Sequence, residues 1–409
     1  VYNELTALGA DMVLGEHYLD EIREGTQTVF KTPGIRCDVP ALKAAEKSGA
    51  EITSEMELFF ETCPCKIIAV TGSDGKTTTT SLIYEMLKAA GYTCHLGGNI
   101  GKPLVAEVGD IKSDDVCVVE LSSFQLHTMK RSADIAVVTN VTPNHLDWHT
   151  DFDEYKNSKK AVFKYQKSGG RVVLNYDNDI TREFGKETDN AVYFSRKEIL
   201  DNGFCLIGDK VVRRINGRDE REVLDINNIF IPGMHNVENY MAAAAAVEGL
   251  AEDGIIRRTA IDFKGVPHRI EFIREVDGVK YYNDSIASSP ARTTAGLNSF
   301  GDKKVILIAG GYDKKIPFDD FGKVVCDHVK ALVLVGVTSE KIENAVRNAE
   351  NFNNLPIYRC TEFKQAAEKA KEVAKDGDTV ILSPACASFD LFKNFEERGN
   401  TFKNIVKGF

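Results

Sequence analysis

Short runs of β-branched and other apolar residues alternate along the chain with longer segments whose apolar residues recur at helical spacing. This alternation is typical of α/β architecture with mainly parallel sheets. The apolar runs predict strands at residues 66–71, 116–121, 135–141, 171–175, 305–309, 331–335 and 379–382. The amphipathic segments predict helices at residues 76–90, 154–165, 236–250, 318–328, 339–349, 362–374 and 388–398.

The 409 residues are too many for one hydrophobic core, so the chain is expected to form more than one domain. Three blocks are predicted: residues 1–54, residues 55–265 and residues 266–409. The first looks like the remains of a small α/β domain, and the second carries most of the candidate chemistry. Glycine and proline punctuate secondary structure, so the segment 265–267 is the expected hinge before the third block.

Composition excludes several classes of protein. The net charge of −10 argues against a general nucleic-acid binder, which would carry a basic surface. No apolar run is long enough for a membrane span, and no signal segment opens the chain, so a cytoplasmic protein is expected. Nine cysteines are scattered, and the one close pair, Cys63 and Cys65, lacks the spacing of a zinc or redox motif. These cysteines are expected to be buried, reduced thiols.

A phosphate-binding turn is predicted after the strand at 66–71. Glycines let backbone N–H groups converge on phosphate oxygens, and a helix N-terminus adds partial positive charge. Lys76 would neutralise the β- and γ-phosphates, and Thr77 would offer its hydroxyl to Mg²⁺. A full P-loop would need glycine where Val70 stands, so the turn is a shorter variant, or else a chance Gly-Lys-Thr sequence. The turn reads Gly72, Ser73, Asp74, Gly75, Lys76 and Thr77.

Two further candidates follow apolar strands. Glu120 ends the strand at 116–121, and His145 follows the strand at 135–141. Ligands bind at the carboxyl ends of strands in open α/β sheets, so both residues are candidate metal ligands. The alternatives are a solvated acid at the strand end and a structural histidine. The helix that contains Lys159 and Lys160 reads, by its periodicity, only as a solvated basic face.

Taken together, these residues resemble the Mur ligases, which build peptidoglycan precursors. The turn, Glu120, the run from Asn140 to His145 and the region of Lys159 occur in that family's order and spacing. The resemblance covers nearly the whole chain. Four further segments are similar to the members that add D-glutamate: residues 97–101, 120–126, 233–239 and 383–390.

The resemblance implies three domains: a truncated Rossmann-like N-terminal domain, a central P-loop ATPase-type domain with a mainly parallel sheet, and a C-terminal Rossmann-like domain. It also implies a monomeric, cytoplasmic enzyme of peptidoglycan synthesis. This enzyme would use ATP and two Mg²⁺ ions to couple D-glutamate to UDP-N-acetylmuramoyl-L-alanine through an acyl-phosphate. Its partners would be small molecules, with neither nucleic acid nor a membrane.

The resemblance further implies roles for single residues. Lys76, His145 and Lys159 would be catalytic, with Lys159 carrying an N-carbamate. The metal ligands would be Thr77, Glu120, His145 and the carbamate of Lys159. ATP contacts would come from Gly72, Ser73, Asp74, Gly75, Lys76, Thr77, Thr78, Asn236, Asn239, Arg269 and Asp284. Contacts to the other substrates would come from Gly34, Asn99, Ser122, Lys314, Ser388 and Phe395.

The sequence departs from the family pattern in two places. The chain starts at Val1, and the strand, Gly-rich turn and helix that cradle uridine in relatives are not found, so the N-terminal domain is expected to be incomplete. Ile286 stands where many relatives have a lysine, whose charge Lys314 or Lys315 would supply instead.

Three other functions are alternatives: another ligase of the superfamily, such as a folylpolyglutamate synthase or a different Mur ligase; a P-loop kinase or NTPase; and a non-catalytic nucleotide-binding protein. The segment 383–390 argues against the first of them.

Overall fold

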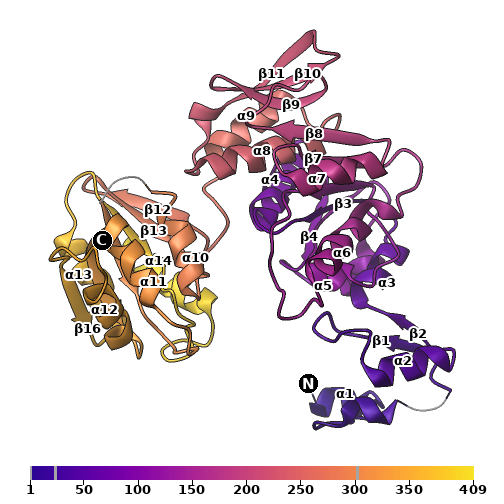
Figure 1. The fold of residues 1–409 in the computed structure, drawn as a ribbon, viewed down its shortest axis with the longest axis horizontal. Helices are drawn as coiled ribbons and strands as arrows, with labels where there is room; N and C mark the ends of the chain where they lie inside the picture. Colours follow the sequence, from indigo (N-terminus) through magenta and orange to yellow (C-terminus); the bar gives the residue numbers. More distant parts are fainter. Residues whose placement is uncertain (1, 23–24, 301–303) are drawn as a thin grey trace. The chain divides into compact units, whose positions relative to one another are not determined.

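The computed structural model describes residues 2–22, 25–300 and 304–409. It divides into two compact units. The first unit comprises Val1–Asn228 and Val237–Ile261, and the second comprises Ile229–Asn236 and Asp262–Phe409. Both units contain helices packed on sheets rich in parallel strands, which confirms the predicted fold class (Figure 1). The division into three domains stays a prediction.

The first unit is built on a nine-stranded sheet in the order β11-β10-β9-β8-β7-β6-β3-β5-β4. Neighbouring strands from β4 to β9 pair in parallel, and β9, β10 and β11 pair antiparallel. The strands are β3 (Lys66–Thr71), β4 (Cys94–Gly98), β5 (Val116–Glu120), β6 (Ile135–Val138), β7 (Arg171–Asn175), β8 (Ala191–Ser195), β9 (Gly203–Ile207), β10 (Lys210–Ile215) and β11 (Asp219–Asp225).

Helices cover this sheet. The α-helices are α3 (Glu55–Thr62), α4 (Lys76–Ala89), α5 (Ser123–Leu126), α6 (Phe152–Lys164), α7 (Asp179–Phe184), α8 (Met234–Ala246) and α9 (Asp253–Asp262). Short 3₁₀ helices are η2 (Leu104–Asp110), η3 (Gly185–Glu187) and η4 (Ile226–Asn228). The strand β3 lies between β6 and β5 and is almost wholly buried, which explains its continuous apolar sequence. The predicted strands and helices of this region are confirmed to within a few residues.

The N-terminal part of the first unit is small. Two three-residue strands, β1 (Thr28–Phe30) and β2 (Glu51–Thr53), pair in parallel, and α2 (Pro40–Lys47) connects them. Before them come α1 (Tyr2–Ala7) and η1 (Tyr18–Glu21). This is a single β-α-β connection, and that it belongs to an incomplete α/β domain stays a prediction.

The second unit carries a six-stranded sheet in the order β12-β13-β17-β14-β15-β16. All neighbours pair in parallel except β12 with β13. The strands are β12 (Glu271–Val276), β13 (Val279–Asn283), β14 (Val305–Ala309), β15 (Val329–Val335), β16 (Ile357–Cys360) and β17 (Thr379–Leu382). The helices are α10 (Pro290–Leu297), α11 (Asp319–His328), α12 (Ser339–Arg347), α13 (Phe363–Val373) and α14 (Phe395–Lys407).

The prediction of a helix at residues 388–398 is wrong for most of that range. The helix begins only at Phe395, because the side chain of Asn394 accepts a hydrogen bond from the Glu397 N–H and caps it. Residues 388–394 form a loop whose turn is closed by the Ser388 carbonyl. The apolar residues of this loop therefore pack from an irregular backbone rather than from a helical face.

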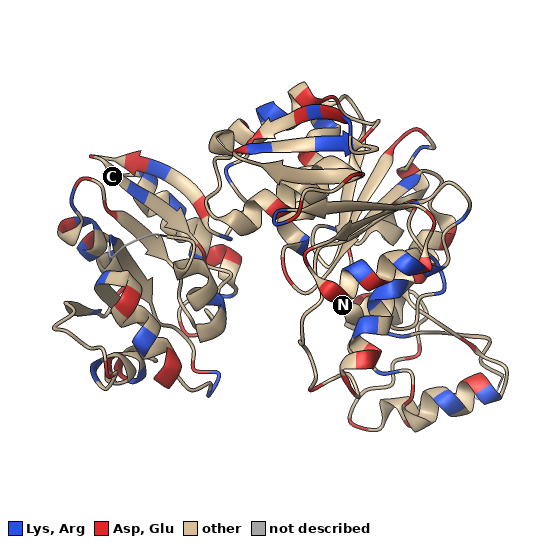
Figure 2. Cartoon of the chain, turned by 45° about the horizontal axis from the view of Figure 1, so that its top comes forward, with Lys and Arg blue, Asp and Glu red and all other residues tan. Residues whose placement is uncertain are grey.

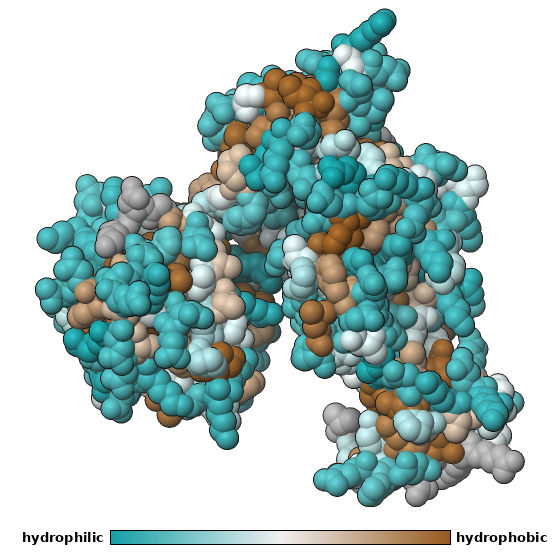
Figure 3. All heavy atoms as spheres, viewed as in Figure 1, coloured by the Kyte–Doolittle hydropathy of each residue, from teal (hydrophilic) through white to brown (hydrophobic). Residues whose placement is uncertain are grey.

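The surface of each unit is polar. Basic and acidic residues are interspersed on the helices of both units (Figure 2), and hydrophilic residues dominate the visible face of each (Figure 3). None of the described helices is both long and apolar enough to cross a membrane.

Candidate active site

The predicted phosphate turn joins the end of β3 to the first residue of α4. Gly75 precedes the helix in the left-handed conformation (φ 80°), and a Cβ there would lie 2.4 Å from Oδ1 of Asn239. At Gly72 (φ 148°) a Cβ would lie 2.0 Å from Oγ1 of Thr139. Both glycines are therefore required by backbone conformation and by close neighbours. The first N–H groups of α4 lack intrahelical partners, so this end of the helix is suited to hold an anion.

The loop after β6 fixes the turn from one side. The carbonyl and the side-chain oxygen of Asn140 accept hydrogen bonds from the N–H groups of Ser73 and Asp74, both at 2.9 Å. Oγ1 of Thr139 donates to the Asp74 carbonyl (2.6 Å). On α6, Tyr155 pairs its hydroxyl with Oγ of Ser73 at 2.8 Å. These bonds between protein groups hold the shape of the turn, so the turn is preorganised for a phosphate.

Two lysine ammonium groups meet at the turn. Nζ of Lys76 donates to the carbonyls of Gly72 (3.1 Å) and Ser73 (2.9 Å). Nζ of Lys159, on α6, donates to the same Gly72 carbonyl at 2.8 Å and lies 4.5 Å from the ring centre of Tyr155. Lys159 is only 1% exposed, and burial together with the nearby Lys76 charge holds its pKa well below the usual range. The expectation of a solvated basic face is wrong at Lys159.

Glu120 ends β5, beside the turn. In the sheet register it pairs with Val70 of β3 and with Gly98 of β4. Its Oε1 accepts a hydrogen bond from the side chain of Asn99 (2.8 Å), while Oε2 is buried without a hydrogen-bond partner. A buried carboxylate oxygen without a donor is costly unless a cation binds there. Thr77 and Thr78, in the first turn of α4, are also buried.

His145 lies on the exposed loop after β6, with a positive φ of 54° and its ring 4.9 Å from that of Phe124. The same loop holds the N-terminal segment, since Nε1 of Trp148 donates to the Gly34 carbonyl (3.1 Å).

Ser122 caps α5 in a reciprocal capping box with Gln125. A cap role alone accounts for Ser122.

An ion-pair network also joins the N-terminal segment to α6. The guanidinium of Arg36 donates to both carboxylate oxygens of Glu154, at 2.9 and 3.0 Å, and His127 and His149 flank the same carboxylate. The hydrogen bond from Arg36 holds the pKa of Glu154 far below its usual value. This bidentate pair fixes the loop that carries Gly34 against α6.

The predicted adenine-side residues lie on α8 and are both buried. Asn239 accepts from Oγ1 of Thr79 (3.2 Å) and lies against Gly75, so it belongs to the wall of the turn. Asn236 donates to the carbonyl of Pro232 (2.6 Å).

In the second unit, Asp284, Lys314 and Ser388 lie on loops that follow the carboxyl ends of parallel strands, whereas Arg269 precedes β12 and Phe395 begins α14. Asp284 follows β13, and its Oδ2 accepts a hydrogen bond from Oγ of Ser383 (2.6 Å). Burial raises the pKa of Asp284 to about 7. Oδ1 accepts from the Ile270 N–H at 3.3 Å, next to Arg269. Asp284 thus joins the loop after β13 to the loop after β17.

The loops that carry Lys314 and Ser388 are joined by a backbone hydrogen bond from the Tyr312 N–H to the Ala387 carbonyl (2.9 Å). Lys314 is exposed, and its Nζ donates to Oγ of Ser288 at 3.3 Å. Ser288 is only two residues from Ile286, which agrees with Lys314 supplying a charge near that position. Ser388 is buried.

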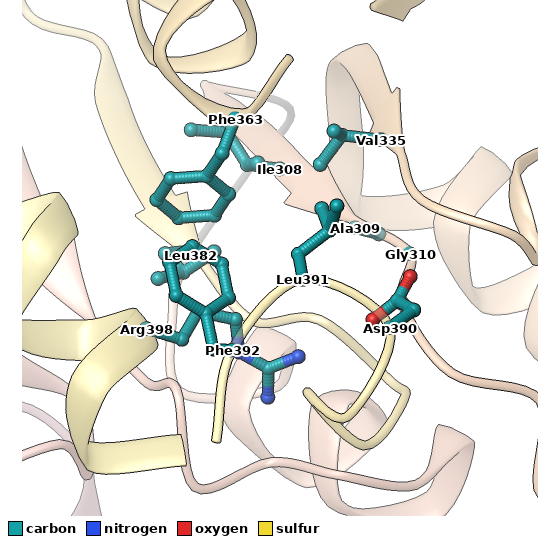
Figure 4. Close-up of a pocket in the computed structure, with 11 residues that line it drawn as sticks. Ile308, Ala309, Gly310, Val335, Phe363, Leu382, Asp390, Leu391, Phe392 and Arg398 are labelled. Atoms are coloured by element: carbon teal, nitrogen blue, oxygen red, sulfur yellow. The ribbon is translucent and has the colours of Figure 1, made fainter. Parts of the chain in front are cut away.

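The carbonyl of Phe395 accepts from Oγ of Ser285 (2.8 Å). Arg398 of the same helix is 3% exposed and donates to Ser285 and to the carbonyls of Cys386 and Ala387. Burial lowers the pKa of this guanidinium to about 10. Arg398 therefore acts as a brace for the loop 383–388, a role that sequence reasoning missed. A small hollow beside it is lined mainly by apolar side chains (Figure 4), among them Ile308, Val335, Phe363, Leu382 and Leu391.

Sequence reasoning also missed Thr139, Tyr155 and Arg36. Thr139 could have been noticed as a polar residue at the end of an apolar strand next to the turn. Nothing in the sequence pairs Arg36 with Glu154, which lies 118 residues away along the chain.

Comparison with known proteins places these observations in a family. Residues 70–247 match the model of the Mur ligase middle domain, and residues 268–386 match that of the Mur ligase glutamate ligase domain. A UDP-N-acetylmuramoylalanine–D-glutamate ligase from Acetivibrio thermocellus is 57% identical over 96% of this chain and 85% of that protein. One from Clostridium novyi is 52% identical over 98% of this chain and 87% of that protein.

Solved structures share the fold. The UDP-N-acetylmuramate–alanine ligase MurC from Thermotoga maritima matches with a TM-score of 0.63 at 20% identity, over 99% of this chain and 90% of that one. The MurF ligase from Thermotoga maritima in complex with ADP matches with a TM-score of 0.60 at 17% identity, over 95% and 97%.

Proposed function

The chain belongs to the Mur ligase family, and from this membership we infer that it is an ATP-dependent ligase that joins D-glutamate to UDP-N-acetylmuramoyl-L-alanine in peptidoglycan synthesis. The single observation that carries this function is the 57% identity to a D-glutamate ligase over nearly the whole chain. Because its substrates are ATP and a nucleotide-linked sugar, we place the reaction in the cytoplasm. We also propose that the enzyme is a monomer.

The turn at 72–77 is proposed to hold the ATP phosphates. The first N–H groups of α4 would donate to phosphate oxygens, and Lys76 would turn from the loop carbonyls to the β- and γ-phosphates. Asn239 and Asn236 would define the adenine side. Support comes from the two positive-φ glycines and from the bonds that fix the turn without a ligand.

The carboxylate of Glu120 fits a magnesium ligand. Oε2 of Glu120 is a buried carboxylate oxygen without a hydrogen-bond donor, and it lies one strand away from the turn that carries Thr77. Thr77, Glu120, His145 and a carbamate on Lys159 would hold two Mg²⁺ ions. When bound, these ions would neutralise the phosphates and the attacking carboxylate.

The buried amine of Lys159 fits the proposed carbamate. A lowered pKa increases the share of neutral amine, which is the form that can add to CO₂ with loss of a proton. The product is an anion beside Lys76, so the like-charge repulsion at the turn would become an attraction.

The proposed reaction has two steps. The alanyl carboxylate attacks the γ-phosphorus of ATP, which forms an acyl-phosphate and releases ADP. The D-glutamate amine then attacks the acyl carbon, and phosphate leaves. Lys76 and the α4 N–H groups would stabilise the negative charge that spreads over the transferred phosphoryl group.

The remaining predicted residues are proposed to bind the substrates. Gly34 and Asn99 would lie near the UDP-sugar, and Lys314, Ser388 and Phe395 near D-glutamate. In the second unit, Arg269 and Asp284 would contact ATP. Ser122 would act near the substrate through the α5 cap that it forms.

Oxygen-18 placed in the alanyl carboxylate tests the function. The ligase must transfer one labelled oxygen to the released phosphate, and ADP release must require D-glutamate rather than L-glutamate. A kinase or a simple NTPase would leave the label in the substrate, and that result would refute the proposed mechanism.

A further inference from the structure

Three cysteine thiols meet at the amino end of the central sheet, away from the phosphate turn. Cys63 follows α3, Cys65 directly precedes β3, and Cys117 is the second residue of β5. Their sulfur atoms are 3.5 Å (Cys65–Cys117), 3.6 Å (Cys63–Cys65) and 3.8 Å (Cys63–Cys117) apart. The sequence shows only the pair Cys63 and Cys65, whereas the pairing of β3 with β5 supplies the third thiol.

These separations fit a metal centre. Zinc–sulfur bonds are about 2.3 Å long, so tetrahedral geometry places two sulfur ligands about 3.8 Å apart. All three observed distances lie at or slightly below that value. A disulfide needs sulfur atoms about 2.05 Å apart, so it would require one pair to approach by roughly 1.5 Å. The triangle thus matches three ligands of one ion better than a bonded pair with a spare thiol.

The other group of potential metal ligands in the described part of the chain shows the contrast. His127, His149 and Glu154 also lie close together. However, Glu154 is already held by two hydrogen bonds from Arg36 and one from the Thr150 N–H. A cation there would have to displace a guanidinium. At the thiol triangle, the three sulfur atoms contact one another, and two of them make long contacts (3.7 Å) to the backbone carbonyls of Cys65 and Lys66.

We propose that Cys63, Cys65 and Cys117 form a structural site for one soft d¹⁰ cation, Zn²⁺, bound by three thiolates. Each thiol would release a proton on binding. Cys63 is only partly buried, and a water molecule would be the fourth ligand. The ion would tie the end of α3 and the start of β3 to β5.

This site is separate from the proposed ligase site. The triangle lies at the amino ends of β3 and β5, whereas the phosphate turn follows the carboxyl end of β3. The six residues of β3 span about 20 Å at about 3.3 Å per residue. Zinc is therefore expected to raise the melting temperature rather than to change the chemical step.

Zinc binding to the full chain tests the site. The protein is stripped of metal in reducing buffer and titrated with Zn²⁺, with native mass spectrometry for stoichiometry and X-ray absorption for ligand type. We expect one Zn²⁺ per chain with three sulfur ligands and a Zn²⁺-dependent rise in melting temperature. Cys117→Ala should weaken binding by at least about 100-fold. Cys94→Ala, which removes a thiol from the neighbouring strand β4 outside the triangle, should bind as the unchanged chain does.

Three results would overturn the proposal: equal affinity in the unchanged chain and in Cys117→Ala, equal loss in Cys94→Ala, or a disulfide within the triangle in protein kept under non-reducing conditions. If Cys117→Ala does not fold, the rate of cysteine alkylation in the unchanged chain tests the zinc site instead. Zn²⁺ must slow modification of Cys63, Cys65 and Cys117 but not of Cys94, and equal rates with and without Zn²⁺ would refute the site.

Discussion

Replacing Lys159 by methionine separates its proposed catalytic role from its packing. Methionine is unbranched and of similar length, so it can fill the space of this 1%-exposed side chain without an amine. Relative to the unmodified lysine, the change removes one hydrogen bond to the Gly72 carbonyl, worth about 1 kcal/mol, and one cation–π contact with Tyr155, worth roughly 0.5–2 kcal/mol. The Gly72 carbonyl keeps its bond from Lys76.

Opposing this loss, the burial of an ammonium group costs several kcal/mol that methionine does not incur. The free energy of unfolding should therefore change by no more than about 2 kcal/mol in either direction. Turnover should respond far more strongly, because the carbamate ligand disappears. Removing a single group that stabilises charge in the transition state typically lowers kcat by about 10²–10³-fold, or roughly 2.7–4 kcal/mol.

The assay measures kcat by ADP release at saturating substrates, the ATP dissociation constant by titration, and the melting temperature. Carbon-13 bicarbonate should give a carbamate resonance in the unchanged chain that Lys159→Met lacks. Lys160→Met is the matched control, since the Lys160 ammonium pairs with Glu187 at 2.6 Å on the outer face of the same helix. A kcat within about threefold of the unchanged chain in Lys159→Met, or an equal loss in Lys160→Met, would refute the reasoning.

Three further outcomes are expected. Glu120→Gln should lower kcat by about 100-fold at fixed Mg²⁺ without lowering the melting temperature, because it removes a buried charge; unchanged activity across a Mg²⁺ titration would contradict the metal role. Gly75→Ala should weaken ATP binding at least about tenfold, because its Cβ would meet Asn239, whereas Gly91→Ala, also at positive φ but in open space, should cost only about 1 kcal/mol of stability and leave ATP binding unchanged. Asp284 binds a proton more tightly when folded than when unfolded, so its contribution to stability is complete below about pH 4 and is lost as pH rises through about 7. Denaturant unfolding of Asp284→Asn should show a smaller loss of stability between pH 5 and about pH 8 than the unchanged chain, and parallel pH profiles would contradict the raised pKa.

Local patterns made much of the fold predictable. The strand β3, the turn and α4 follow directly from one another in the sequence, and each part has a local cause: apolar residues, glycines and a helix start. The same applies to the parallel strands β5, β6, β14 and β17. The strand β11 was missed, because its first four residues are charged and exposed. The helix predicted at 388–398 failed because the Asn394 cap sets its start.

The α/β class, the glycine-containing turn at 72–77 and, through resemblance, the family follow from the sequence alone. Only the tertiary structure shows the burial, the charged neighbours and the hydrogen-bond partners of each side chain. Lysine is usually exposed, yet the packing of α6 against the turn buries the amine of Lys159 and lowers its pKa. Sheet register leaves one oxygen of Glu120 without a donor and brings Cys117 to Cys63 and Cys65. Burial, electrostatic environment and ligand geometry depend on contacts between residues far apart in the chain, and no local pattern encodes them.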